Sequence, residues 1–461
     1  MTIKTTQSLI SLGRTSSGMV LAHPAQRENF GTVAGLIKML RACDQPGDFY
    51  DFQRRLFGPI YSAEKRRGQC SRIVKRLKDG KSLPKDAPAP PPLGDPTELA
   101  SWELEVYVYA RIARQLRMVG DGLAWRCFGY DRRVILTLSR NDSSGMLYGK
   151  DGLPYELGRI QELWENDRHF ALHHDLTNCL RIADLTEFTG DGGALLREIK
   201  AKPHTEKKQL DRSQAAVNAL MHGGNLPGPR SDARLVQLTE LYVTSLRQLG
   251  DVIEQAKQDG CYGTGLTQGR ALMASSLPAI VARYGEDKEE GGRAIETARQ
   301  QAIAAAGITM TLHHVKGSSG DNASRSPIMA PWSIYPFAAE DCAALICDLL
   351  VFETTTSGDA LIASLERAGL RAELLLQPSN GLLAGDMDVL RAYLGNGALT
   401  WHAHGLNLLL FELVEPDTLA RGTREVLSMA NPPSEPVMTY SHEAETWLPA
   451  VEENDSTEST P

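Results

Sequence analysis

The segment DLTEFTGDGGALLREIK, residues 184–200, decides the fold that the sequence predicts. Two apolar runs flank the glycine-rich turn TGDGG, a pattern typical of antiparallel strands joined as a hairpin. Side chains alternate faces along a strand, so Glu198 and Lys200 project together while Ile199 points to the opposite side. We expect the hairpin to bring the carboxylate of Asp184 beside that of Glu198.

The predicted grouping of two carboxylates and an ammonium group suits a catalytic metal site. Two adjacent carboxylates repel one another unless a cation joins them, and hard oxygen ligands select Mg²⁺ or Mn²⁺. The ion can activate a water and neutralise charge on a phosphodiester, while the ammonium of Lys200 orients that water or stabilises the transition state. The alternative is structural: a salt bridge between Glu198 and Lys200 on an exposed strand, with Asp184 as a turn or edge residue.

The flanking segments extend an α/β pattern. Before the hairpin, LPYELGRIQELWEN predicts a short helix and RHFALHH a strand. After it, TEKKQLDRSQAAVNALMHGG carries the start and stop signals of a helix, and LVQLTELYVT predicts another strand. The predicted order is therefore helix, three strands, helix, strand.

With Asp184…Glu198-Ile199-Lys200 in that order of elements, residues 152–250 resemble the PD-(D/E)xK nuclease superfamily. The resemblance implies a restriction-endonuclease-like α/β fold, in which a central mixed sheet is flanked by helices. It also implies that Asp184 and Glu198 are metal ligands, that the carbonyl of Ile199 is a further ligand, and that Lys200 is the catalytic lysine.

The resemblance assigns roles on both flanking helices. Glu156, on the preceding helix, matches a position where many members add another acid, and it is a candidate metal ligand. Candidate nucleic-acid contacts lie on the following helix: Lys207, Lys208, Gln209 and Gln214. One departure concerns the first motif, because Ala183 rather than proline precedes Asp184.

The rest of the chain divides into further predicted segments, and no internal repeat is evident. They are an N-terminal helical region (1–83), a Pro-rich linker (84–96), the nuclease-like domain (97–280), a second α/β domain (281–449) and a disordered acidic tail (450–461). The basic run KRRGQCSRIVKRLKDGK (65–81) either meets phosphate or forms a solvated helix face.

Composition narrows the class of protein. The chain has 49 Lys plus Arg against 57 Asp plus Glu, a net charge of -8, which argues against a protein that coats nucleic acid by bulk charge. Seven cysteines without a CxxC pair predict reduced, mostly buried thiols.

Other candidate motifs are weaker. Structural roles are favoured for the pairs His173-His174, His313-His314 and His402/His404. Neither GDGLAW nor YGTGLTQG forms a nucleotide-triphosphate loop.

These observations predict a cytoplasmic, metal-dependent nuclease with no membrane segment. By family precedent the substrate is nucleic acid, preferably DNA, and such nucleases often serve in prokaryotic defence against phage or foreign DNA. The C-terminal domain would contact substrate, a protein partner or a second copy in a homo-oligomer. The alternative is a non-catalytic, nuclease-like module for interaction or nucleic-acid binding.

Overall fold

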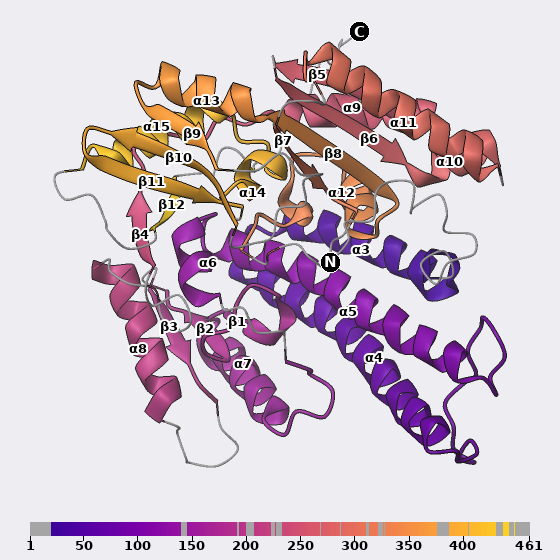
Figure 1. Cartoon of the computed structure of the whole chain (residues 1–461). Helices are drawn as coiled ribbons and strands as arrows, with labels where there is room; N and C mark the ends of the chain where they lie inside the picture. Colours follow the sequence, from indigo (N-terminus) through magenta and orange to yellow (C-terminus); the bar gives the residue numbers. More distant parts are fainter. Residues whose placement is uncertain are drawn as a thin grey trace, which may run out of the picture.

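The computed structural model describes most of the chain as a mixed α/β protein (Figure 1). The described residues are 20–139, 145–190, 193–199, 207–222, 226, 233–267, 269–285, 287–309, 313–320, 326, 328–375, 387–403, 405–429, 437–441 and 447. Lys200 and the predicted tail, 450–461, lie outside them. Within these ranges, no helix has the length and hydropathy that a membrane span requires.

In the N-terminal part of the described chain, the helices are α3 (Pro24–Ala42), α4 (Pro46–Lys78) and α5 (Leu99–Cys127). The Pro-rich linker joins α4 to α5, and the two helices pack along each other as a long antiparallel pair (Figure 1). The predicted domain boundary at residue 97 therefore lies between two helices that share one packed interface.

The GDGLAW segment of α5 is a packing motif. A side chain at Gly120 would collide with the carbonyl oxygen of Leu176 in the 3-10 helix η2 (His174–Leu176), and one at Gly122 would collide with Ser333. Between these glycines, Asp121 accepts hydrogen bonds from the backbone amides of residues 178 and 179. The two glycines let other segments approach the helix backbone closely, and Asp121 anchors the segment that follows η2.

The hairpin predicted from residues 184–200 is confirmed. Strand β2 (Leu185–Phe188) pairs with β3 (Ala194–Arg197) in antiparallel register, with Leu185 opposite Arg197. On its other edge β2 pairs with β1 (Ala171–His173), also antiparallel. Helix α7 (Leu153–Asp167) precedes this sheet, and α8 (Lys207–His222) follows it.

The sheet differs from the mixed sheet that the sequence predicts. In the described residues it has the order β1-β2-β3 and only antiparallel pairs. Strand β4 (Arg234–Gln237) instead pairs in parallel with β12 (Val437–Tyr440), near the end of the chain. A short helix, α6 (Arg132–Leu138), packs against α8.

A four-stranded antiparallel sheet of order β5-β6-β8-β7 occupies the other side of the molecule (Figure 1). Its strands are β5 (Cys261–Thr267), β6 (Arg270–Ser276), β7 (His314–Ser318) and β8 (Leu350–Ser357). Its neighbouring helices are α9 (Leu246–Asp259), α10 (Leu277–Tyr284) and α11 (Lys288–Ala305), of which α9 and α11 both pack on β5 and β6. The predicted boundary at residue 280 falls inside this unit, because β6 pairs with β8 across it.

The C-terminal elements repeat the order of the α7–β4 unit. They are α13 (Gly358–Arg367), β9 (Arg371–Leu374), β10 (Asp388–Leu394), β11 (Gly397–His402), α15 (Pro416–Leu427) and β12, with the short α14 (Asn407–Leu410) inserted before α15. Strands β9, β10 and β11 again form an antiparallel three-stranded sheet. The final strands of the two units, β4 and β12, pair with each other. This repetition of element order is not evident in the sequence.

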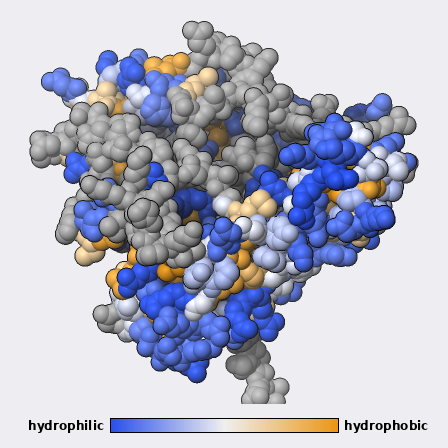
Figure 2. Space-filling model, turned by 90° about the horizontal axis from the view of Figure 1, so that it is seen from below, coloured by the Kyte–Doolittle hydropathy of each residue, from blue (hydrophilic) through white to orange (hydrophobic). Residues whose placement is uncertain are grey.

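The largest hydrophobic core of the described residues joins the N-terminal helices to the β1-β2-β3 and β5-β6-β8-β7 sheets, and the α13–β12 unit has a core of its own. The largest core includes Leu56 of α4, Val119 of α5, Leu172 of β1 and Phe352 of β8. Helix α12 (Ala339–Ile346) and the 3-10 helix η4 (Trp332–Ile334) bring the C-terminal half against α3 and α5. The seven cysteines are all free, five of them buried, which confirms the prediction of unpaired, mostly buried thiols. On the face seen in Figure 2, hydrophobic residues occur in small groups among hydrophilic ones.

Candidate metal centre

Three carboxylates from separate segments converge on one ammonium group. Nζ of Lys150 lies 2.7 Å from Oε1 of Glu156, 2.7 Å from Oδ2 of Asp175 and 3.2 Å from Oδ1 of Asp184. Glu156 belongs to the first turn of α7, Asp175 to η2, and Asp184 immediately precedes β2. The ammonium thus marks a position where oxygen ligands from a helix, a turn and a strand end meet.

The cluster is buried on one side and open on the other. The side chain of Glu156 is 0% exposed, whereas those of Lys150, Asp175 and Asp184 are 27%, 18% and 17% exposed. The first turn of α7 suits a buried carboxylate, because the positive end of the helix dipole lies there. Since three carboxylates surround one ammonium, the cluster keeps an excess of negative charge that favours a further cation.

The pKa shifts agree with a charged cluster. Burial lowers the pKa of Lys150, but the carboxylates, Asp175 foremost, raise it by more, so it lies above the ordinary value for lysine. Burial raises the pKa of Glu156, but His173 and Lys150 lower it by more. For Asp175 too, the upward effect of burial is outweighed, chiefly by Lys150, and the net pKa is lowered. All three groups are therefore ionised near neutral pH.

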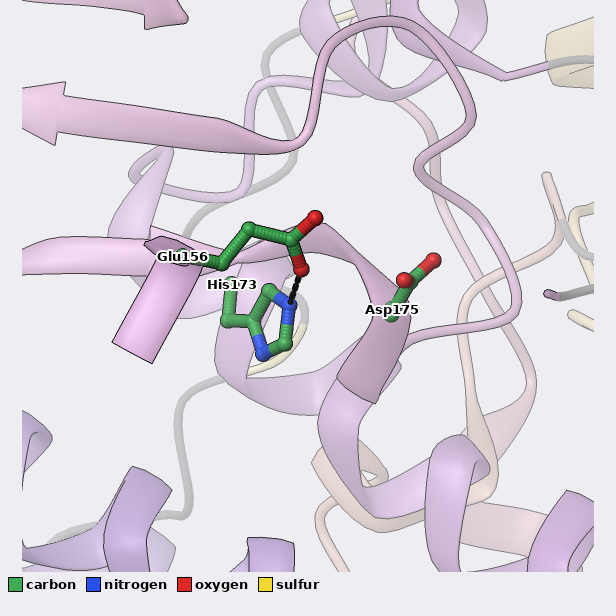
Figure 3. Close-up of side chains that lie close together, drawn as sticks. All are labelled: Glu156, His173 and Asp175. Carbon is green, nitrogen blue, oxygen red and sulfur yellow. Dashed lines mark hydrogen bonds and ion pairs between the residues drawn. The ribbon is translucent and has the colours of Figure 1, made fainter. Parts of the chain in front are cut away.

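His173 adds a nitrogen ligand to the same place (Figure 3). Its Nε2 lies 2.9 Å from Oε2 of Glu156, and Figure 3 shows the imidazole facing that carboxylate, with Asp175 nearby on a separate segment. One ligand atom from each of Glu156, His173 and Asp175 lies within 4.8 Å of the others. No donor among the described residues makes a well-oriented hydrogen bond to Oε1 of Glu156, although Lys150 is close. This buried oxygen is held by the ion pair with Lys150, and a metal ion that binds it has to compete with that ammonium group.

Asp184 is held by the backbone around it. Its Oδ2 accepts a hydrogen bond of 2.8 Å from the amide of Ile199, and its own amide donates to the carbonyl of Arg197 at 2.9 Å. The preceding residue, Ala183, has φ of +68°, which a side chain rarely adopts. Proline cannot adopt this angle, because its ring fixes φ near -65°. The turn here therefore excludes proline at position 183.

Helices α4 and α5 hold the two segments that carry Lys150 and Asp175, one before α7 and the other after β1. Oε2 of Glu64 accepts hydrogen bonds from the amides of residues 147 and 148, and its Oε1 pairs with Arg117 at 2.6 Å. Arg117 in turn donates to the carbonyls of Gly145 and Asp175. Both side chains are buried, so this paired support fixes the loop before α7.

Gln53 of α4 secures β1 from the same side. Its Oε1 accepts a hydrogen bond of 2.8 Å from the amide of His173, and its Nε2 donates to the carbonyl of Ala171 at 2.9 Å. The N-terminal helical pair is therefore part of the structure that builds the cluster.

The structure brings together some of the predicted site residues. Glu156 and Asp184 contact the same lysine. The carbonyl oxygen of Ile199 and Oε1 of Glu156 both border Gly152, since a Cβ atom there would lie 4.0 Å from the first and 3.2 Å from the second. Glu198 is half-buried and follows β3 directly.

The other predicted residues lie elsewhere or outside the description. Lys200 is among the residues that the structure does not describe. Lys207, Lys208 and Gln209 belong to the first turn of α8, but their side chains are not described. Gln214 is exposed and donates to Asn218 on the same helix. In the basic run on α4, Arg66 pairs with buried Glu105 and is structural.

Lys150, His173 and Asp175 are absent from the predicted site. For His173 a signal existed, since His173-His174-Asp175 ends a predicted strand, but the adjacent histidines alone favoured a structural role. Lys150 lies in a glycine-containing loop with no recognisable motif. Its position follows from the support that Glu64 and Arg117 give to that loop.

The comparisons with known proteins add no relatives. No protein-family model matches the chain, and no match was found among curated proteins or solved structures.

The donor set suits a hard divalent cation. Glu156, Asp175 and Asp184 supply carboxylate oxygens around one position. Mg²⁺ and Mn²⁺ prefer oxygen ligands of this kind. His173 could serve Mn²⁺ in addition, although its Nε2 is engaged by Glu156.

Proposed function

We propose that this chain is a metal-dependent phosphodiester hydrolase, a nuclease that acts on nucleic acid and preferably on DNA. The observation that carries the proposal is the convergence of Glu156, Asp175 and Asp184 on one cation position. These residues lie within an order of helix, three strands and helix, which is the order that the resemblance to PD-(D/E)xK nucleases uses.

The residues of the chain divide the work in this proposal. Glu156, Asp175 and Asp184 hold Mg²⁺ or Mn²⁺, and Glu198 and the carbonyl of Ile199 complete the ligand set. The bound ion would lower the pKa of a water and neutralise charge on the phosphodiester. In this proposal, the ion is held from the buried side of the carboxylate cluster. The phosphate group binds at the exposed side, which is formed by Lys150, Asp175 and Asp184.

Lys200 is assigned the role of the lysine that orients the water or stabilises the transition state. Side chains at the start of α8, Lys207 and Lys208 with Gln209, would contact the nucleic-acid backbone, and Gln214 lies further along the same helix. A role in defence against phage or foreign DNA rests on the resemblance alone.

A second function, a non-catalytic binding module, is favoured by one observation: Lys150 already neutralises part of the carboxylate cluster. If that lysine is a permanent structural cation, the cluster needs no metal ion. Binding of a divalent cation therefore separates the two functions.

The test is cleavage of supercoiled DNA, linear DNA and RNA by the purified chain in Mg²⁺, Mn²⁺ or EDTA. We expect metal-dependent cutting that Lys200→Ala abolishes and that the matched control Lys257→Ala leaves intact, because Lys257 pairs with Glu254 and Asp341 away from the cluster. Cutting that persists in EDTA, or in the Lys200→Ala protein at the wild-type rate, would refute the proposed mechanism.

A further inference from the structure

We propose that Lys150 is a tethered counter-ion that occupies the divalent-cation position in the metal-free protein and withdraws when the metal binds. The inference rests on the proposed function and deepens it, since it says how the same site is controlled. It follows from where Nζ lies: within 3.2 Å of an oxygen from each of Glu156, Asp175 and Asp184.

An ammonium and a divalent cation cannot share this position. A metal ion held by the same oxygens would lie about 2.1 Å from each of them if it were Mg²⁺, so it would overlap with Nζ and repel its charge. Binding by these ligands therefore requires the side chain of Lys150 to leave. In the metal-free protein the same side chain relieves the repulsion among carboxylates, one of which is fully buried.

The surroundings allow this movement without unfolding. The backbone just before Lys150 is fixed by Glu64, which accepts hydrogen bonds from the amides of residues 147 and 148. Gly149, with φ of +85°, comes next. The lysine side chain is 27% exposed, so its flexible four-carbon chain has solvent to swing into. The carboxylates are held independently, Asp184 by the amide of Ile199 and Glu156 by His173.

Lys150→Met tests the competition, because it removes the charge and keeps much of the side-chain volume. We expect it to lower the melting temperature in EDTA, since three carboxylates lose their counter-ion. We expect the variant to bind Mn²⁺ at least about tenfold more tightly than wild type does, because no ammonium group has to leave the site before the ion can bind. Mg²⁺ and Mn²⁺ should then raise the melting temperature of the variant by more than that of wild type.

Lys150→Arg is the matched variant. It keeps the positive charge, so it should retain stability in EDTA and bind Mn²⁺ more weakly than Lys150→Met. Equal Mn²⁺ affinity in wild type and Lys150→Met would overturn the inference and leave the proposed function standing. If neither protein binds a divalent cation in calorimetry, the proposed function fails, and the inference fails with it.

A measurement on the wild-type protein avoids any folding defect of the variants. Acetylation by a water-soluble reagent, read out by mass spectrometry, reports how accessible each lysine amine is. Mg²⁺ should increase the acetylation of Lys150 several-fold and leave that of the ion-paired Lys257 unchanged. No change at Lys150, under conditions where calorimetry shows the metal bound, would overturn the inference.

Discussion

At the scale of single residues, the cluster shows how much of a site can depend on one backbone angle. Ala183 holds a left-handed φ of +68° and so directs Asp184 back toward the amide of Ile199. An L-residue in this conformation costs about 1 kcal/mol. The angle positions Asp184 in the carboxylate cluster and excludes proline at position 183.

Substitutions at Ala183 test whether its positive φ is needed to place Asp184. Ala183→Pro should unfold the turn, lower the melting temperature by several degrees and weaken Mn²⁺ binding, because the proline ring fixes φ near -65°. Ala183→Gly is the control, and we expect it to be at least as stable as wild type, since glycine adopts positive φ without strain. Thermal unfolding and calorimetry check both variants; a fully stable proline variant with wild-type affinity would disprove the assigned turn.

A second feature at the scale of single residues, the ion pairs of buried Glu105, predicts how the stability of the N-terminal helices changes as the pH falls. Buried Glu105 of α5 contacts His23 and makes two hydrogen bonds with Arg66. Burial raises its pKa, but these two partners lower it by more, so its pKa lies below the ordinary 4.5. A carboxyl with a depressed folded pKa contributes stability above its unfolded pKa and loses it as the pH falls through the folded value.

Glu105→Gln should therefore cost about 2 kcal/mol near neutral pH, with the difference from wild type shrinking as the pH drops below about 4.5. Unfolding midpoints measured across this range check the prediction. Glu103→Gln is the control on the same helix, because its pair with Lys78 is exposed and should contribute little. A pH-independent difference for Glu105→Gln would show that the carboxylate charge is not responsible.

At the scale of elements, close contacts between helices explain why glycines stand at positions that take no part in the proposed reaction. The glycines of GDGLAW lie where η2 and η4 meet α5, and Gly120 faces the carbonyl of Leu176. Because Leu176 ends the same 3-10 helix that carries Asp175, this contact also helps to position a member of the carboxylate cluster.

Gly120→Ala should destabilise the protein by about 3 kcal/mol, because the added methyl group overlaps a backbone oxygen that cannot easily move. Gly35→Ala in α3 is the matched control. Nothing lies within 4 Å of a side chain added there, so it should be neutral or stabilise by about 0.5–1 kcal/mol through helix propensity. Denaturant unfolding measures both, and equal effects of the two substitutions would contradict the packing argument.

The elements also show what the sequence could predict. Alternation and the TGDGG turn are local signals, so the β2–β3 hairpin could be predicted, and with it the position of Asp184 near the end of β3. The predicted contact of Asp184 with Glu198 stays a prediction. Lys150 and Asp175 could not be predicted, because their positions depend on Glu64 and Arg117, whose helices lie far away in the sequence. The same is true of β4, whose partner β12 lies about two hundred residues later.

At the scale of the whole molecule, the predicted domains do not correspond to separately packed units. The core joins α4, α5, β1 and β8, and β6 pairs with β8 across the predicted boundary at 280. Two units of the same element order, α7–β4 and α13–β12, are linked through the parallel pair of their last strands. The carboxylate cluster is on the first of these units.

A fragment of residues 97–280 should therefore fail to fold alone. It would expose the face of α5 that packs on α4 and the edge of β6 that pairs with β8, and unpaired edges and apolar faces favour aggregation. Circular dichroism and thermal unfolding of the fragment beside the full chain check this. Cooperative unfolding of the isolated fragment would instead support an independent central domain.

The most direct test of the central claim is a calorimetric titration with Mn²⁺ of wild type, Asp184→Asn and Asp388→Asn. Asp388 opens β10, the second strand of the other three-stranded sheet, and pairs with His402 at the surface, so it is a matched control. We predict one site in wild type and Asp388→Asn with equal affinity, and an affinity at least about tenfold weaker in Asp184→Asn. Wild-type affinity in Asp184→Asn, or no binding by the wild-type protein, would contradict a metal centre at Glu156, Asp175 and Asp184.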